Sequence, residues 1–149
     1  MALNQFLSKI FGSKSQRDLK EVAPYVTKIK EIYPTIEQLD NDGLRARTDA
    51  LRKRIADYTQ DKTDEIEQLK SGLEEQNLEQ RDETWKRIDK LEEEILDKNE
   101  EILDQILPEA FAIMKDTARR FKENEQIVVT ANERDKELAA THDFVTIEG

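Results

Sequence analysis

Cysteine is missing from this sequence of 149 residues, which excludes disulfide bonds and thiolate metal sites. Glycine and proline are scarce, at four and three residues, and an all-β sandwich or barrel needs more tight turns than these can supply. No apolar run reaches the roughly 18 to 20 residues that cross a bilayer. These absences favour a helical protein, soluble or peripheral, in a reducing compartment such as the cytosol.

The charge of the chain is large and unevenly placed. Charged residues make up 39% of the sequence and hydrophobic residues 36%, a balance that favours extended helices over a thick core. Residues 61–104 carry 17 acidic and 7 basic side chains, a difference of -10 that equals the net charge of the whole chain. This acidic segment repels phosphates, so nucleic acid is not expected as a partner.

The first residues predict an amphipathic helix over 1–13, because large apolar side chains recur there at helical spacing. These are Leu3, Phe6, Leu7, Ile10 and Phe11. Residues 1–31 carry six basic and three acidic side chains, which suits an anionic lipid surface, with Lys9 and Lys14 in the water. The residues by themselves favour another interpretation, a helix packed on the body of the protein or on a second copy.

The next segment predicts helix that is interrupted by proline. Ser15 and Asp18 form a capping-box pattern at the start of a second helix. Pro24 is expected to remove one backbone hydrogen bond and to bend this helix. Pro34 suits the first turn of a short further segment that runs through Leu39.

Two long amphipathic helices follow and predict an antiparallel coiled-coil hairpin. Asp40 or Asn41 caps the first helix, and Gly72 with the polar residues after it marks the turn. Asn77 with Gln80 offers a capping box for the second helix. Isoleucines repeat in that helix at intervals of seven residues, at Ile88, Ile95 and Ile102.

Several side chains of the hairpin are candidates for functional groups. Trp85, the single tryptophan, is expected near the tip, where packing on the opposing helix is favoured and an exposed docking site is the alternative. The hairpin carboxylates lie beside Lys or Arg at helical spacing, so we interpret them as a solvated helix face and not as a metal or acid-base site. They are Asp61, Asp64, Glu65 and Glu67, and Glu92–Glu94 with Asp97, Glu100 and Glu101.

Two other features resemble sites only superficially. The stretch Gly12-Ser-Lys-Ser15 lacks the second glycine of a phosphate loop and follows a predicted helix where that loop follows a strand. The only histidine, His142, stands in a polar stretch without cysteine or a second histidine, and we expect it at the surface.

The end of the chain predicts one more helix. Pro108 marks a bend or a new first turn before a helix over Glu109–Phe121, whose Phe111, Met114 and Ala118 are expected to face inward.

A change of composition follows that helix. Ile127–Thr130 and Phe144–Ile147 are rich in β-branched residues and predict a small two-stranded element. The expected fold is therefore mainly α: a long antiparallel coiled-coil hairpin with shorter helices, and a small β element near the C-terminus.

Three segments carry a family resemblance. They are Leu7-Ser-Lys-Ile-Phe-Gly-Ser-Lys14, then Leu39-Asp-Asn-Asp-Gly-Leu-Arg-Ala-Arg-Thr48 with the Arg-rich turn after it, and Leu107-Pro-Glu-Ala-Phe-Ala-Ile-Met-Lys-Asp-Thr-Ala-Arg-Arg120. In order and spacing they resemble the opening of the SecA family, the motor ATPases that push unfolded preproteins through the bacterial membrane channel. The resemblance covers roughly residues 1–58 and 105–121.

The sequence departs from the family pattern in two places. After Arg119-Arg120-Phe121 the family continues into an adenine-reading segment and a phosphate loop, and here Lys122–Thr130 follows instead. The stretch between Tyr58 and Leu107 is much longer than the family's usual linker. We therefore expect the N-terminal part of a larger protein into which a helical hairpin is inserted.

For the parent protein the resemblance implies ATP-driven transport of unfolded preproteins through a SecY-type channel, with ATP and magnesium as cofactors. It implies a cytoplasmic protein, peripheral to the inner face of the bacterial cell membrane. Anionic phospholipid, the channel complex and a second copy of the chain are the partners implied for the first helix. The contact residues are Leu3, Phe6, Leu7, Lys9, Ile10, Phe11 and Lys14. The chain alone is expected to hold no catalytic residue, cofactor or metal.

Five regions are expected along the chain. They are the amphipathic helix 1–13, a helical start of the first motor domain over 14–58, the acidic hairpin 59–106, the helix 107–123 and a truncated β element over 124–149. A docking arm or a spacer is the hypothesis for the hairpin. The rival from another class is a free-standing acidic coiled-coil adaptor or scaffold without enzymatic activity, whose resemblance to SecA is accidental.

Overall fold

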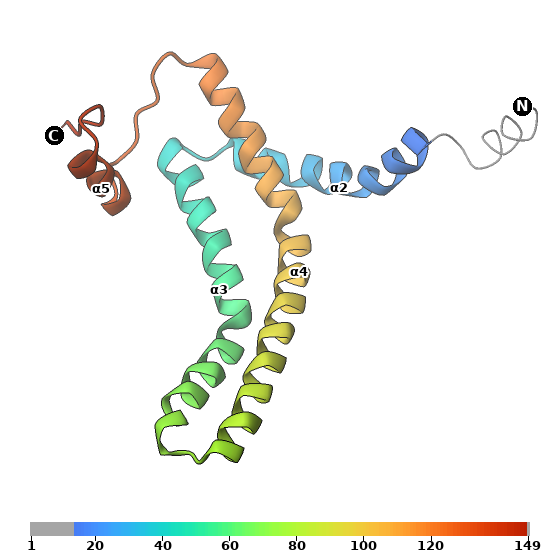
Figure 1. Cartoon of the computed structure of the whole chain (residues 1–149). Coiled ribbons are helices and arrows are strands. Elements are labelled where there is room, and N and C mark those ends of the chain that lie inside the picture. The colour runs from blue at the N-terminus through green and yellow to red at the C-terminus, as the bar shows by residue number, and fades with distance from the viewer. Residues whose placement is uncertain (1–13, 149) are drawn as a thin grey trace, which may run out of the picture.

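The computed structural model describes residues 14–148, and the described part of the chain contains helices without any strand. The elements are α2 (Lys14–Glu37), α3 (Asn41–Ser71), the 3-10 turn η1 (Leu73–Glu75), α4 (Leu78–Glu123) and α5 (Glu133–Thr141). The long helices α3 and α4 form an arm, α2 crosses its base and extends away from it, and α5 lies beside the base (Figure 1). Within residues 14–148 no helix combines the length and the hydropathy needed to span a bilayer.

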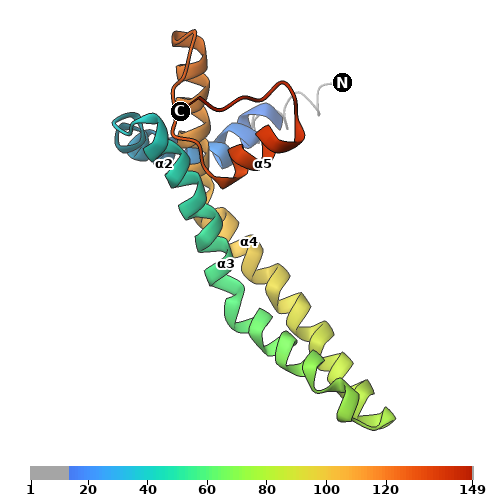
Figure 2. The same ribbon diagram turned by 90° about the vertical axis from the view of Figure 1, so that its left-hand side faces the viewer.

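The predicted helical hairpin is confirmed. Helices α3 and α4 run antiparallel and pack along their length (Figures 1 and 2). Asp40 caps α3 by accepting a hydrogen bond from the Gly43 amide at 2.6 Å. Asn77 and Gln80 form the expected capping box of α4, with bonds of 3.0 and 3.1 Å. Local sequence therefore fixes where each arm begins.

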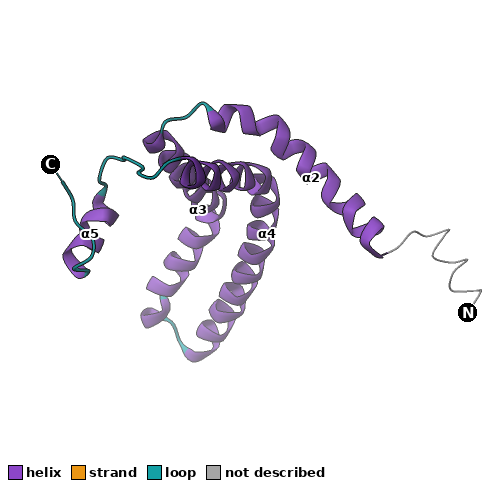
Figure 3. Cartoon of the chain, turned by 90° about the horizontal axis from the view of Figure 1, so that it is seen from above, coloured by secondary structure: helices purple, strands orange, loops and turns teal. Residues whose placement is uncertain are grey.

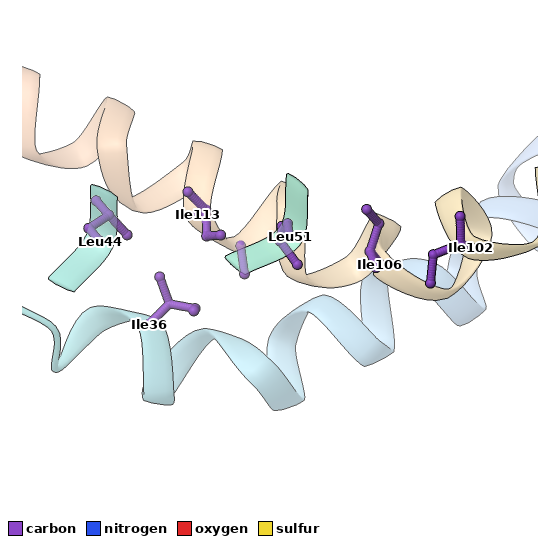
Figure 4. Packing of buried hydrophobic residues seen from close by; sticks show 7 residues of the cluster. Ile36, Leu44, Leu51, Ile102, Ile106 and Ile113 are labelled. Carbon is purple, nitrogen blue, oxygen red and sulfur yellow. The ribbon is translucent and has the colours of Figure 1, made fainter. Parts of the chain in front are cut away.

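The core is thin and divided into two clusters. The larger lies where α2, α3 and α4 meet, and Figure 4 shows its side chains converging from the three helices. Its buried members are Ile36, Leu44, Leu51, Ile102, Ile106, Ala112 and Ile113. The smaller cluster consists of Ile66, Ile88 and Leu91, farther along the arm. Burial of apolar surface between two helices is the main stabilising term available to such an arm.

Helix α2 differs from the prediction at its start and at its prolines. Ser15, expected as the N-cap, lies inside the helix, because Lys14 is already helical. Pro24 and Pro34 both stand inside one continuous helix, so the predicted new segment at Pro34 is wrong. The carbonyls that lose their N–H partners belong to Lys20 and Lys30, which are exposed, and water can bond them there.

Helix α4 likewise continues where a break was expected. Pro108 is buried inside the helix, which runs for 46 residues. An interior proline costs about 3 kcal/mol, but Ile106 on one side and Ala112 on the other are buried in the same cluster. Packing on both sides of Pro108 therefore keeps the two halves of α4 aligned. This contribution of tertiary packing cannot be recognised from the local sequence pattern.

The predicted β element is wrong. Figure 3 shows loop on either side of α5 and no strand in the described part of the chain. The stretch around Ile127–Thr130 is held by side chains of α3. The Asn41 amide donates to the Val128 carbonyl at 3.0 Å, and Asp42 accepts from the Thr130 amide at 2.8 Å. The β-branched residues favour a strand, but a strand also needs a paired edge, and side chains of α3 take that place here.

We predict that Leu91→Ala, at a position with no exposed surface in the smaller cluster, lowers the free energy of unfolding by about 2 to 4 kcal/mol. Urea unfolding followed by helical circular dichroism measures it. Leu96→Ala on the same helix is the matched control, because Leu96 is 65% exposed and its truncation is expected to cost about 0.5 kcal/mol or less. Equal losses in the two variants would show that the arm does not pack through Leu91.

Candidate functional site at the base of the hairpin

A buried carboxylate joins the helices at the base of the arm. Asp116 of α4 has no exposed surface. Its Oδ1 accepts from Arg119 Nη2 at 2.7 Å and from the Tyr33 hydroxyl of α2 at 3.3 Å, and its Oδ2 accepts from Arg120 Nε at 2.8 Å. Both oxygens are thus hydrogen-bonded, which a buried charge requires.

Arg120 extends this network to the start of α3. Its Nη1 donates to Asn41 Oδ1 at 2.7 Å and its Nη2 to the Leu39 carbonyl at 2.5 Å. The guanidinium is nearly buried, with 10% of its side chain exposed. One arginine therefore fixes the turn between α2 and α3 against α4. We call Asp116, Arg119, Arg120 and Tyr33 the base network.

The network sets the protonation of its members. Burial by itself raises the pKa of Asp116, but hydrogen bonds from Arg119 and Arg120 together with their charges outweigh it, so this pKa lies below its ordinary value. The hydrogen bond to Asp116 is the main cause that raises the pKa of Arg119. Asp116 is therefore a carboxylate at neutral pH, and the arrangement is an ion pair and not an acid-base dyad.

The base network also explains a wrong prediction about this helix. Phe111, Met114 and Ala118 were expected to face inward, and all three are exposed, Met114 to 65%. The inward face carries Asp116 and Arg120 instead. A hydropathy pattern assigns charged residues to the solvent side. The sequence shows only that Asp116 lies three and four residues before two arginines, and its burial became visible in the structure alone.

An apolar groove of about 490 Å³ lies beside the base network. Helices α3 and α4 and the extended segment after α4 line it, with Leu44, Ile113, Met114, Phe121 and Ile127 among its apolar residues. Met114 and Phe121 are more than 60% exposed, at 65% and 69%. An exposed apolar surface next to a groove is typical of a face that packs on further protein.

The extended segment is fastened across the same base. Asp42 accepts from the Thr130 hydroxyl at 2.6 Å, and the hydrogen bonds from this hydroxyl and from the Thr130 amide lower the pKa of Asp42. Arg45 bonds the Thr130 carbonyl at 3.1 Å and pairs with Asp135 of α5 at 2.6 Å. Side chains of α3 thus position both the segment and α5.

The sequence-predicted contact residues lie mostly outside the described residues. Leu3, Phe6, Leu7, Lys9, Ile10 and Phe11 precede residue 14, and Lys14 is the exposed first residue of α2. The base network therefore contains none of the residues that the sequence singled out for membrane or channel contact.

The structure also places the other candidate residues of the sequence. His142 is exposed at the end of α5, as expected, 2.8 Å from the Thr141 hydroxyl. Trp85 lies near the tip of the arm with 46% of its surface exposed, so the alternative of an exposed tip fits better than packing on α3. Among residues 14–148 no group of three or more His, Cys, Asp or Glu side chains is placed to hold a metal ion.

Comparison with known proteins decides the family. The model of the SecA DEAD-like domain matches residues 7–132. The chain belongs to the SecA family. The protein translocase subunits SecA of Porphyromonas gingivalis and Parabacteroides distasonis are 58% and 55% identical to it over 149 and 148 residues. That of Flavobacterium psychrophilum is 40% identical over 148 residues. No solved structure gave a significant match.

The extent of these matches is informative. They cover 99% to 100% of this chain but 13% of each relative, so the chain spans about an eighth of the length of these SecA subunits. Because the matches run through the whole chain, the acidic hairpin lies within them. The hairpin is therefore a part that this chain shares with SecA subunits of several species.

We predict that Asp116→Asn lowers the free energy of unfolding by about 3 kcal/mol near neutral pH, because it leaves two guanidinium groups without their shared carboxylate. Since the pKa of Asp116 is lowered by folding, its contribution is present above the unfolded pKa of about 4 and is lost as pH falls through the lower folded value. The difference in the free energy of unfolding between the unaltered protein and Asp116→Asn should therefore become smaller in acid.

Urea unfolding at a series of pH values measures this difference. Asp57→Asn is the control, because Asp57 is 59% exposed and pairs with Lys53 on the surface of α3, where such a pair contributes little. A difference in the free energy of unfolding that does not change with pH would contradict the role assigned to Asp116. An equal loss in Asp57→Asn would contradict it as well.

Proposed function

We propose that this chain is the N-terminal region of an ATP-driven preprotein translocase, in which it joins membrane contact to the motor. The parent protein moves unfolded preproteins through a SecY-type channel and binds ATP with magnesium elsewhere in its sequence. Residues 1–149 supply the first helix and part of the scaffold of the first motor domain. The match of residues 7–132 to the SecA DEAD-like domain carries this proposal.

The structure supports a peripheral contact at the start of the chain. Helix α2 extends away from the arm and leads back toward residues 1–13 (Figure 1). Apolar side chains are exposed along it, with Leu19 at 66% and Val22 at 51%. Basic residues lie beside them, including Lys14, Arg17 and Lys20. Apolar and basic residues on one exposed helix suit an anionic phospholipid surface.

The contact residues predicted from the sequence come before α2 in the chain, except for Lys14, its first residue. We assign membrane or channel contact to Leu3, Phe6, Leu7, Lys9, Ile10, Phe11 and Lys14, with a second copy of the chain as an additional partner. In this role the translocase is cytoplasmic and peripheral to the inner face of the membrane. The rival, an adaptor with an accidental resemblance to SecA, loses its premise because identity reaches 58% over the whole chain.

We expect Lys9→Gln with Lys14→Gln to weaken binding to phosphatidylglycerol vesicles about tenfold or more, since each lysine near an anionic surface contributes about 1 kcal/mol. Vesicle flotation measures the binding. The matched control is Lys53→Gln with Lys86→Gln, which removes the same charge at side chains that are 74% and 72% exposed elsewhere. Equal weakening in both pairs would mean that overall charge, and not the first helix, governs binding.

A further prediction concerns which part of the translocase hydrolyses ATP. Phosphate release by the chain of residues 1–149 is expected to stay at the background rate with ATP and magnesium, whereas the complete SecA subunit turns over ATP. A colorimetric phosphate assay on both proteins at equal concentration measures this. ATP turnover by the 149-residue chain alone would overturn the assignment of the motor chemistry to the rest of the protein.

A further inference from the structure

The tip of the arm presents an apolar surface that nothing in residues 14–148 covers. Leu78 is 86% exposed and Trp85 is 46% exposed. They are seven residues apart, which is about two turns, so they lie on one face of α4. Together with Glu79, Arg81 and Asp82 they line a shallow hollow. Figure 2 shows the tip at the end of the arm remote from α2 and α5.

The tip is preformed and not a loose end. Arg81 Nε donates to the Leu73 carbonyl at 2.9 Å, and Arg81 Nη2 donates to the Glu74 carbonyl at 3.3 Å. The Thr84 hydroxyl bonds Gln76 Oε1 at 2.9 Å. The turn between α3 and α4 is thus tied to the first turns of α4. A surface fixed in advance loses less conformational entropy when it binds a partner.

The charge around this apolar surface is mainly negative, because residues 74–86 carry five acidic and two basic side chains. Glu74, Glu75 and Glu79 are exposed and form no ion pair within the described part of the chain. Two cations lie in this stretch: Arg81 bonds the carbonyls of the turn, and Lys86 pairs with Asp82 at 2.6 Å. Carboxylates therefore outnumber cations around the hollow and leave it with a net negative charge.

We infer that the tip of the hairpin docks a polypeptide segment in which lysine or arginine stands next to large apolar side chains. The apolar residues of such a segment fill the hollow between Leu78 and Trp85, and its cations meet the carboxylates around the hollow. Anionic lipid and nucleic acid are repelled by the same carboxylates. A second copy of the tip carries like charge, so self-association at this surface is disfavoured as well.

Trp85 provides the probe for this inference, because it is the only tryptophan of the chain. Titration of the 149-residue protein with a short amphipathic peptide of lysine and leucine is expected to shift Trp85 emission to shorter wavelength as the ring is covered. Added salt should weaken the binding, because the cations and carboxylates lie at the surface. The same peptide with glutamine in place of lysine should bind at least about tenfold more weakly.

Leu78→Ser separates docking at the tip from general attraction between an acidic arm and a cationic peptide. It keeps Trp85 and every charge, and it should weaken the peptide about tenfold because it removes the apolar half of the hollow. Leu96→Ser is the matched control, since Leu96 is 65% exposed on the same helix but lies outside the hollow. We expect its affinity to stay within about twofold of the unaltered protein.

Three results would overturn the inference. They are an unchanged Trp85 emission at saturating lysine-leucine peptide, equal weakening by Leu78→Ser and Leu96→Ser, and equal affinity for the lysine and glutamine peptides. Circular dichroism of each variant shows that the helices are intact, as expected for substitutions at exposed positions. None of these measurements depends on vesicles or on ATP, so the outcome is independent of the proposed translocase role.

Discussion

The ion pair between Asp116 and its two arginines is the interaction on which the arrangement of the helices depends. It brings Tyr33 of α2, the Leu39 carbonyl before α3 and the C-terminal part of α4 into one hydrogen-bonded unit. A buried carboxylate that lost these partners would be strongly unfavourable. The pair therefore acts less as a source of net stability than as a device that admits one packing of three helices and penalises the others.

The arm beyond this base depends on a narrower set of contacts. Only Ile66, Ile88 and Leu91 are buried in its outer cluster. Ion pairs run across the two helices there, such as Lys62 with Glu94 at 2.7 Å and Lys98 with Asp61 at 2.9 Å. Because these pairs are partly exposed, each contributes little by itself. The carboxylates of the hairpin thus serve solubility and register, and a thin apolar seam with two well-capped helix starts holds the arm together.

Exposed apolar surface is found at both the base and the tip of the arm. The groove beside Met114 and Phe121 and the face of α2 lie at the base, whereas Leu78 and Trp85 lie at the tip. The groove at the base suits burial by further protein, and the face of α2 is the surface that we propose for anionic lipid. The tip lies apart from them and carries an excess of carboxylates, and for these reasons we propose it as a docking surface for another polypeptide.

Local sequence by itself determined the helical class, the family and the starts of the arms, because caps such as Asp40 and the Asn77–Gln80 box act within one turn. It could not determine whether Pro34 and Pro108 break a helix, since the packing of the residues around them is tertiary. Nor could it predict that the face of α4 with Asp116 is buried, because a hydropathy pattern places a charged residue at the surface and does not show its buried partners. The segment at Thr130 is hydrogen-bonded by side chains of α3 and does not pair with a second strand. Only the folded arrangement brings those residues together.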